Sequence, residues 1–407
     1  MVPGVGEREL SSWKEIAAHL GVGVRTAQDW ERTRGLPIRR LPGPRGRVTV
    51  NVAELNAWRN AASAASSEES LGSPVRAGRP RMTSWVLAGL ASLALITTGF
   101  WWLQPGAPAA FRVERNTLVV LDHAGREAWR KNVPGINAGA YGNGDFVWFG
   151  NLGGEESVLF AVAPSRPDGE SSLICYGKDG RERWRFTPGR TVHTRSEVFP
   201  PPFDLRRFIV AKLGHDGRTR ILVVSNHYLY YPAQVALLDE HGHLLREYWH
   251  SGHVDHTIVE RNGRTLLLAG VSNGTKRATL VRLDPDTMTG ASGEENPDYQ
   301  LQGFAPGVEV QRLLFPRSDI NTRLEPYALV EDLWEHGGEI TVVVNHRIAP
   351  NTAAVYYHLN EDLTLREMVV SSGFEENHAA LFATRALDHR LSEGEANGLR
   401  AIASVAR

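Results

Sequence analysis

The densest group of side chains that could bind a metal is a short histidine-rich segment. His250, His253 and His256 are spaced three residues apart, and Asp255 precedes the last of them. Imidazole nitrogens and carboxylates are common Zn²⁺ ligands, which makes the segment a candidate metal site. In an extended strand, however, this spacing places the side chains on alternate faces. We therefore expect hydrogen bonding at a sheet edge instead, and we assign no metal ligand.

The remaining residues contain no recognisable catalytic set. The order of the Ser, His and Asp residues identifies no nucleophile with its base, and no pair of carboxylates stands out as an acid and a base. Cys175 is the single cysteine, which excludes an intramolecular disulfide and a cysteine-based metal site. We therefore predict that the chain is not an enzyme, that it has no catalytic residue and that it needs no cofactor.

A second group of side chains could contact the phosphates and bases of DNA. Five arginines and no acidic residue lie between residues 34 and 47, and the preceding segment carries arginine and glutamine, which suit guanine and adenine. The alternative is a solvated surface in a domain that has lost DNA binding, and Asp29 and Glu31 favour it. The predicted DNA-contacting residues are Arg25, Thr26, Gln28, Arg32, Arg34, Arg39, Arg40, Arg45 and Arg47.

The elements that would position these side chains can be predicted from local signals. Ser12 and Glu15 have the spacing of a capping box, which predicts a helix from Trp13 to Leu20. A glycine-containing break at 21–23 precedes a second helix over 24–33. Residues 36–50 then read as a strand, a Pro/Gly turn and a strand, and Asn51 would begin a last helix.

Residues 11–60 resemble the MerR/excisionase-type winged helix-turn-helix. The resemblance lies in W-K-E-I-A at 13–17, G-V-G-V-R-T-A-Q-D-W-E at 21–31, G-L-P at 35–37 and E-L-N-A-W at 54–58. It implies a small α-rich domain over residues 1–60 that binds double-stranded DNA. The second helix would enter the major groove and the wing would contact the flanking backbone.

Residues 85–103 form an uncharged apolar run long enough to span a bilayer as one helix. Arg76, Arg79 and Arg81 precede it and no charge follows it directly, which predicts a cytoplasmic N-terminus. The alternatives are a cleaved signal peptide and a helix buried in a core. The favoured interpretation is a single-pass protein of the bacterial cytoplasmic (inner) membrane with its C-terminal domain outside the cytoplasm.

The charge distribution supports two compartments. The overall net charge of −1 combines a basic segment before the apolar run with an acidic segment after it. A basic head favours a polyanionic partner. Residues 61–84, which are rich in Ala, Ser, Gly and Pro, are predicted to be a flexible basic linker.

Within residues 104–407 the sequence consists of short runs rich in β-branched residues, which are separated by turns. A strand, a D-x-x-G-like turn and a strand with an aromatic residue recur. Such recurrence predicts an all-β radial repeat of six or seven blades, with an irregular β-sandwich as the alternative. The recurring segments are 118–130, 173–186 and 235–249 and, more weakly, 280–290 and 356–368.

These hairpins resemble the blades of PQQ-like and FG-GAP-type β-propellers. Related quinoproteins often carry a vicinal cysteine pair at their cofactor, which this chain lacks. Calcium-binding FG-GAP turns are rich in acidic residues, whereas Asp216-Gly217 has no flanking carboxylates, which argues against calcium.

The predicted fold class is therefore multidomain: a winged helix-turn-helix, one transmembrane helix and a propeller. The favoured function is a membrane-anchored one-component transcription regulator, with an extracytoplasmic propeller sensing an unknown ligand or protein. Such a regulator would gain affinity for DNA as a homodimer. The alternatives are a membrane-tethered binding or scaffold protein with a vestigial or protein-binding head, and a propeller enzyme. The propeller's sensing role rests on analogy between folds.

Overall fold

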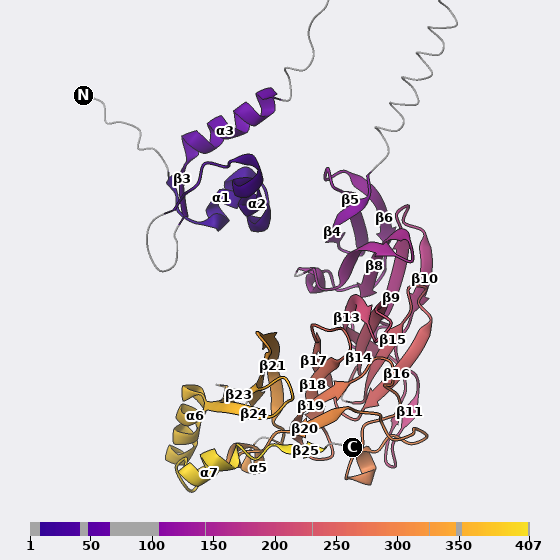
Figure 1. Ribbon diagram of the computed structural model, residues 1–407, viewed down its shortest axis with the longest axis vertical. Helices are drawn as coiled ribbons and strands as arrows, with labels where there is room; N and C mark the ends of the chain where they lie inside the picture. The colour runs from indigo at the N-terminus through magenta and orange to yellow at the C-terminus, as the bar shows by residue number, and fades with distance from the viewer. Residues whose placement is uncertain are drawn as a thin grey trace, which may run out of the picture. The chain divides into compact units, whose positions relative to one another are not determined.

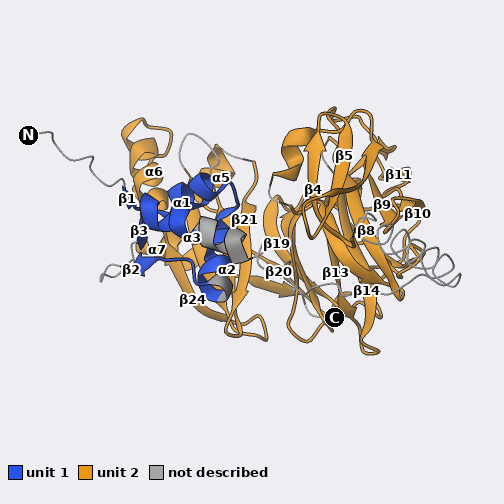
Figure 2. Cartoon of the chain, turned by 90° about the horizontal axis from the view of Figure 1, so that it is seen from above, with its two compact units in different colours: residues 1–95 blue, residues 96–407 orange. Residues whose placement is uncertain are grey.

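The computed structural model describes residues 9–40, 48–65, 106–142, 144–229, 231–324, 326–346 and 352–405. The chain divides into two compact units, residues 1–95 and residues 96–407, which are coloured separately in Figure 2. The predicted transmembrane segment at 85–103 and most of the linker at 61–84 lie outside the described residues.

The first unit combines three helices with a small antiparallel sheet (Figure 1). The strands pair in the order β1-β3-β2, and Arg39 lies opposite Thr49. Its elements are β1 (Glu9–Leu10), α1 (Trp13–Leu20), α2 (Val24–Arg34), β2 (Arg39–Arg40), β3 (Val48–Asn51) and α3 (Val52–Ala65).

Local signals set the ends of these helices. The Ser12 side chain accepts a hydrogen bond from the backbone N–H of Glu15, which confirms the predicted N-cap of α1. The helix ends at Gly21, whose φ of 70° is the left-handed conformation that glycine adopts without strain. Asn51 accepts from the backbone of Ala53 at the start of α3.

The prediction of an α-rich winged helix-turn-helix domain is wrong. The core of the first unit draws on its strands as well as its helices, since Val48 and Val50 of β3 pack with Ile16 and Leu55. Two short helices joined by a turn occur in many small domains, so they are a weak signal of family. The structure as a whole is dominated by antiparallel sheet.

The second unit is built from antiparallel sheets that follow one another along the chain. The first contains β4 (Pro108–Glu114), β5 (Thr117–Asp122) and β6 (Glu127–Asn132). The second contains β7 (Val147–Leu152), β8 (Glu155–Val162), β9 (Ser172–Gly177) and β10 (Glu182–Phe186). The third contains β13 (Phe203–Leu213), β14 (Arg218–His227), β15 (Ala233–Leu238) and β16 (Leu244–His250).

The fourth and fifth sheets are also antiparallel, and the fourth gains a fifth strand, β25, from the end of the described chain. The fourth contains β17 (Val254–Val259), β18 (Leu266–Ser272), β19 (Arg277–Leu283), β20 (Gln311–Leu314) and the C-terminal β25 (Ala403–Val405). The fifth contains β21 (Leu329–His336), β22 (Glu339–Asn345), β23 (Ala354–Leu359) and β24 (Leu365–Val370). A separate two-stranded sheet pairs β11 (Val192–His193) with β12 (Val198–Phe199).

Helical turns connect some of these strands. Three short helices accompany the fifth sheet, and their N-terminal serines are Ser318, Ser371 and Ser392. The helical segments of this unit are α5 (Asp319–Arg323), α6 (Ser372–Ala383), α7 (Glu393–Gly398) and the 3-10 turns at Ala138–Tyr141 and Pro297–Tyr299.

A hydrophobic core lies between each sheet and the next. In β14, Leu222 packs toward the fourth sheet, whereas its neighbours Ile221 and Val223 pack toward the second. In β18, Leu267 and Leu268 divide in the same way between two cores. Because successive side chains of a strand face opposite sides, a sheet buried on both faces needs a continuous apolar run.

The recurring turns form the hairpins predicted at 118–130, 173–186, 235–249 and 356–368. Gly180 and Gly242 have φ values of 74° and 80° at these turns. A Cβ atom on Gly180 would lie 2.7 Å from the Trp129 ring, and one on Gly242 would lie 2.6 Å from the Trp184 ring. The aromatic residue of one hairpin therefore packs on the turn of the next sheet.

The hairpin predicted at 280–290 is not formed. After β19 the chain leaves the sheet at Asp284 and returns only at Gln311, where β20 begins. The backbone of this excursion is fixed to β16, because the Trp249 N–H donates to the Gly290 carbonyl at 2.9 Å and the Ser292 N–H to the Trp249 carbonyl at 2.8 Å.

The predicted closed propeller of six or seven blades is also wrong. The described part of the second unit has five sheets of three to five strands, and no strand of the first pairs with a strand of the fifth. The two end sheets lie apart in both views (Figures 1 and 2). Each hydrophobic core lies between two consecutive sheets. The recurring hairpin pattern therefore indicates that the sheets pack one on the next, but it does not indicate that they close into a ring.

The single-pass membrane localisation is likewise corrected. Among the described residues, no helix combines the length and the apolar composition that a membrane crossing requires.

Candidate functional site

The predicted DNA-contacting residues have different surroundings in the first unit. Arg25, Thr26 and Gln28 are exposed on α2, with the buried Ala27 between them. Arg32 forms an ion pair with Asp29 at 2.9 Å, and Arg39 pairs with Glu54. The side chains of Arg34 and Arg40, and Arg45 and Arg47 altogether, lie outside the described part of the structure. Their role in DNA contact stays a prediction.

The structure does not bring the histidine-rich segment together. His250 Nδ1 lies 3.1 Å from the carbonyl of Gly252, and His253 Nε2 lies 3.2 Å from the carbonyl of His227. The His256 Nδ1 atom instead faces Asp332 at 4.0 Å. The expected hydrogen bonding is thus observed for two of the three histidines. At the turn considered for calcium, the Asp216 carboxylate pairs with Arg220 at 2.9 Å.

A cavity of about 480 Å³ lies beside the excursion between β19 and β20, and it is the best candidate for a binding site. Its size falls within the range of small-molecule sites. The wall combines acidic, neutral polar and aromatic side chains. Its polar, charged and aromatic lining includes Ser292, Glu294, Glu295, Gln300, Phe304, Glu309 and Arg312.

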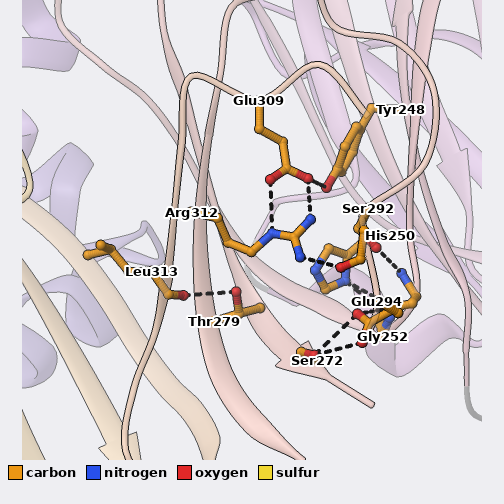
Figure 3. Close-up of polar contacts among 12 residues, drawn as sticks. Tyr248, His250, Gly252, Ser272, Thr279, Ser292, Glu294, Glu309, Arg312 and Leu313 are labelled. Carbon is orange, nitrogen blue, oxygen red and sulfur yellow. Dashed lines mark hydrogen bonds and ion pairs between the residues drawn. The ribbon is translucent and has the colours of Figure 1, made fainter. Parts of the chain in front are cut away.

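Glu294 is the central acidic group of this wall. The residue is 6% exposed, and Ser251 and Ser272 donate their hydroxyl hydrogens to its carboxylate, the latter at 3.1 Å (Figure 3). Burial raises the pKa of Glu294, and these hydrogen bonds oppose the shift. Gly274 makes room for the carboxylate, because a Cβ atom there would lie 2.3 Å from Oε2.

A buried ion pair forms the opposite part of the wall. Arg312 donates to Glu309 from Nε at 2.9 Å and from Nη2, and both side chains are less than a tenth exposed, while its Nη1 donates to the carbonyl of Gly293. Tyr248 donates its hydroxyl hydrogen to the same carboxylate at 2.7 Å (Figure 3). Burial and the Glu309 charge hold the pKa of the Tyr248 hydroxyl well above its usual value.

His250 lies near this ion pair and stays neutral at physiological pH. Burial lowers its pKa to about 4, and the positive charge of Arg312 acts in the same direction. Its Nδ1 atom contacts the backbone of Gly252 rather than the hydroxyl of Ser251. The site therefore holds a serine hydrogen-bonded to a carboxylate, without an adjacent histidine serving as its base.

The charges of the wall do not cancel. Glu309 and Arg312 neutralise one another, whereas Glu294 and Glu295 have no ion-pair partner among the residues that the structure describes. An arrangement of this kind favours a positively charged ligand. Sequence reasoning missed the site because its residues come from β16 and the turn after it, the end of β18, the excursion and β20. The weak 280–290 match to the hairpin was the one available signal.

No family model matches this sequence, and no curated protein sequence is similar to it. The MerR/excisionase and PQQ-like or FG-GAP resemblances are corrected by the structure, which is mostly antiparallel sheet without a closed ring. One solved structure with a partly similar trace, titled "Crystal structure of the eukaryotic initiation factor", is 12% identical with a TM-score of 0.30. The alignment covers 65% of this chain and 63% of that chain, and at this score it carries no argument.

Proposed function

We propose that the second unit is a ligand-binding body that takes a small organic cation, a protonated amine, into the cavity beside Glu294. The observation that carries this proposal is the Glu294 carboxylate, which is buried in a cavity wall with hydroxyl groups as its side-chain partners. A buried charge is costly unless it is paired. A cationic ligand would supply the missing charge.

The surrounding groups suit such a ligand. Glu295 adds a second acidic group at the exposed part of the wall, and Gln300 is fixed by a hydrogen bond to the Glu294 carbonyl at 2.6 Å. Phe304 adds an aromatic ring to the wall, and this ring already holds a cation, because the Arg190 guanidinium lies 5.2 Å from its centre. Cations bind favourably over aromatic faces at this distance.

A matched set of four-carbon compounds tests the proposal. The full chain is titrated by calorimetry with butylamine and 1,4-diaminobutane, and with butanol and butyrate as neutral and anionic counterparts. We expect the amines to bind and to raise the melting temperature, because only they neutralise the buried carboxylate. Glu294→Gln keeps the size of the side chain and removes its charge, and it should weaken amine binding on the order of tenfold or more.

Glu367→Gln is the control, because Glu367 is exposed on β24 and does not line this cavity. It should bind amines like the unchanged protein. Equal affinity for butylamine and butanol, or undiminished amine binding by Glu294→Gln, would overturn the proposal.

For the first unit we propose double-stranded DNA as the partner, so that the chain would act as a ligand-responsive regulator. The specific observation is the exposed group Arg25, Thr26 and Gln28 on α2. Their neighbour Ala27 is buried in the core, so the helix is held with these three side chains toward solvent. Arg25 has no ion pair among the described residues, whereas Arg32 is paired with Asp29.

Fluorescence anisotropy of the full chain on labelled duplexes tests this second proposal. Arg25→Ala should lower the affinity more than Arg32→Ala, since Arg32 is already neutralised. If Arg25 contacts phosphate, its loss should lower the slope of log affinity against log salt by about one unit. Binding that is absent, or that is equally insensitive to both changes, would contradict it.

A further inference from the structure

A second group of side chains converges at the helices beside the fifth sheet, outside the cavity described above. His378 on α6, His389 in the following loop and Glu395 on α7 place one ligand atom each within 4.8 Å of one another. Asp319, the first residue of α5, contacts the same group. We propose that these two histidines and two carboxylates bind a divalent transition-metal ion of the Zn²⁺ type.

The distances among His378, His389 and Glu395 fit a single ion, and Asp319 lies beside them at His389. Glu395 Oε2 lies 3.1 Å from His378 Nε2 and 3.3 Å from His389 Nε2. The Asp319 Oδ2 atom lies 3.1 Å from His389 Nε2. Tetrahedral ligands bound at about 2.1 Å are separated by roughly 3.4 Å, so the observed separations need little adjustment.

His378 provides an independent reason to expect a ligand. The residue is fully buried, and neither of its ring nitrogens forms a hydrogen bond. Its Nε2 atom faces Glu395 at 3.1 Å, but the contact lacks the alignment of a hydrogen bond. A buried polar group without a partner is costly. A metal ion accepting the Nε2 lone pair would remove that cost at Nε2.

His389 is oriented as metal-binding histidines usually are. Its Nδ1 atom contacts the Asp388 carboxylate at 2.8 Å, which directs Nε2 toward Asp319 and Glu395. Asp388 is in turn held by Arg323 at 2.9 Å. A carboxylate on the second ring nitrogen fixes the tautomer and the direction of a ligating imidazole.

A second group of one histidine and two carboxylates, found among the described residues, differs in this respect. Asp286 meets His215 near Asp284, but its carboxylate is already paired with Arg220 at 2.6 Å. An arginine in that position supplies the positive charge that a metal would otherwise bring. We therefore place the ion only at the His378 group.

The proposed role of the ion is structural. His378, His389 and Glu395 would supply three ligands, and Asp319 would supply the fourth and close the tetrahedral shell, as in structural zinc sites. The ligands join α5, at the start of the segment between β20 and β25, to α6 and α7 near its end. The ion would therefore stabilise the folded arrangement of these three helices.

Metal binding by the chelator-treated full chain tests the proposal. We expect Zn²⁺ to bind with one high-affinity equivalent and to raise the melting temperature, whereas Mg²⁺ and Ca²⁺, which prefer more oxygen ligands, should not. Co²⁺ should give the visible absorption of a four-coordinate site. His389→Ala should lower the Zn²⁺ affinity on the order of 100-fold, and Asp388→Asn about tenfold.

His243→Ala is the matched control, because His243 also contacts an aspartate, Asp239, but lies in an exposed turn. It should leave Zn²⁺ binding unchanged. Asp319→Asn provides a second ligand variant if His389→Ala does not fold. Undiminished Zn²⁺ affinity in the ligand variants, or an equal loss in His243→Ala, would overturn the proposal. Amine binding at Glu294 is measured separately, so failure of one proposal leaves the other standing.

Discussion

The Trp184 indole lies on Gly242, and its Nε1–H donates to the carbonyl of Glu240 at 3.2 Å. Trp184 belongs to the second sheet and Gly242 to a turn of the third. The contact explains why the tryptophan and the glycine recur together in the sequence. Glycine adopts the left-handed turn without strain, and it leaves room for a ring from the preceding sheet.

Gly242→Ala should therefore destabilise the second unit by two effects. The φ of 80° is unfavourable for alanine, and the new Cβ atom would lie 2.6 Å from the Trp184 ring. We expect a loss of about 2–4 kcal/mol in the free energy of unfolding. Urea unfolding followed by tryptophan fluorescence measures it.

Gly125→Ala separates the two effects. Gly125 has a φ of 74° in the equivalent turn of the first sheet, with nothing within 4 Å of the added Cβ. Only the backbone cost of about 1–2 kcal/mol should remain. Equal losses at both positions would show that the tryptophan contact contributes nothing.

His250 should make the protein less stable in mild acid. The unfolded chain binds a proton at pKa 6.5, whereas the folded state does so only at about 4. Between these pH values the unfolded state holds more protons, so the free energy of unfolding falls as the pH falls. The contribution should drop by about 2 kcal/mol between pH 7 and pH 4.5.

Urea titrations at the two pH values measure this drop. His250→Gln should have a smaller difference between them, whereas the exposed His241→Gln should keep the difference of the unchanged protein. A pH dependence that is identical in all three proteins would refute the assignment.

Glu309→Gln should be strongly destabilising. Arg312 would keep its positive charge in a buried position while losing its partner, which costs about 3–5 kcal/mol. Tyr248→Phe removes one hydrogen bond to the same carboxylate and should cost only about 1 kcal/mol. A double-mutant cycle should show the two losses to be non-additive, and full additivity would mean that Glu309 and Tyr248 act independently.

Leu363 occupies the place that glycine holds in the other hairpin turns. Its φ is 62°, yet its side chain is only 2% exposed and packs in the core between the fourth and fifth sheets. Leu363→Gly removes core packing worth about 2–5 kcal/mol and relieves backbone strain of about 1–2 kcal/mol. The free energy of unfolding should therefore fall. Leu363→Ala loses packing and keeps the strain. It should therefore be the less stable variant by about 1 kcal/mol, and the reverse order would contradict this account.

Much of the local structure could be predicted from the sequence. Four of the five hairpins form where the turn pattern predicts them, because each depends on residues within about fifteen positions. The capping of α1 by Ser12 follows from a spacing of three residues. The short β-branched runs expected within residues 104–407 also form buried strands, as in β14.

Long-range arrangements could not be predicted in the same way. The hairpin expected at 280–290 is replaced by the excursion that builds the cavity, and no local pattern places Glu294 against Ser251 and Ser272. His378 and Asp319 are distant in sequence, so their meeting depends on the packing of three helices. The expectations of a family and of a closed ring went beyond what local patterns establish.

The pairing of β25 with β20 sets an order of events during synthesis. Leu314 lies opposite Ala403, so the last strand of the described chain completes a sheet whose other members were made nearly ninety residues earlier. Until residues 403–405 leave the ribosome, the edge of β20 lacks this partner, and an open edge can pair with another chain. A nascent or C-terminally clipped protein would thus be exposed to misassembly at this edge, even after its other sheets have formed.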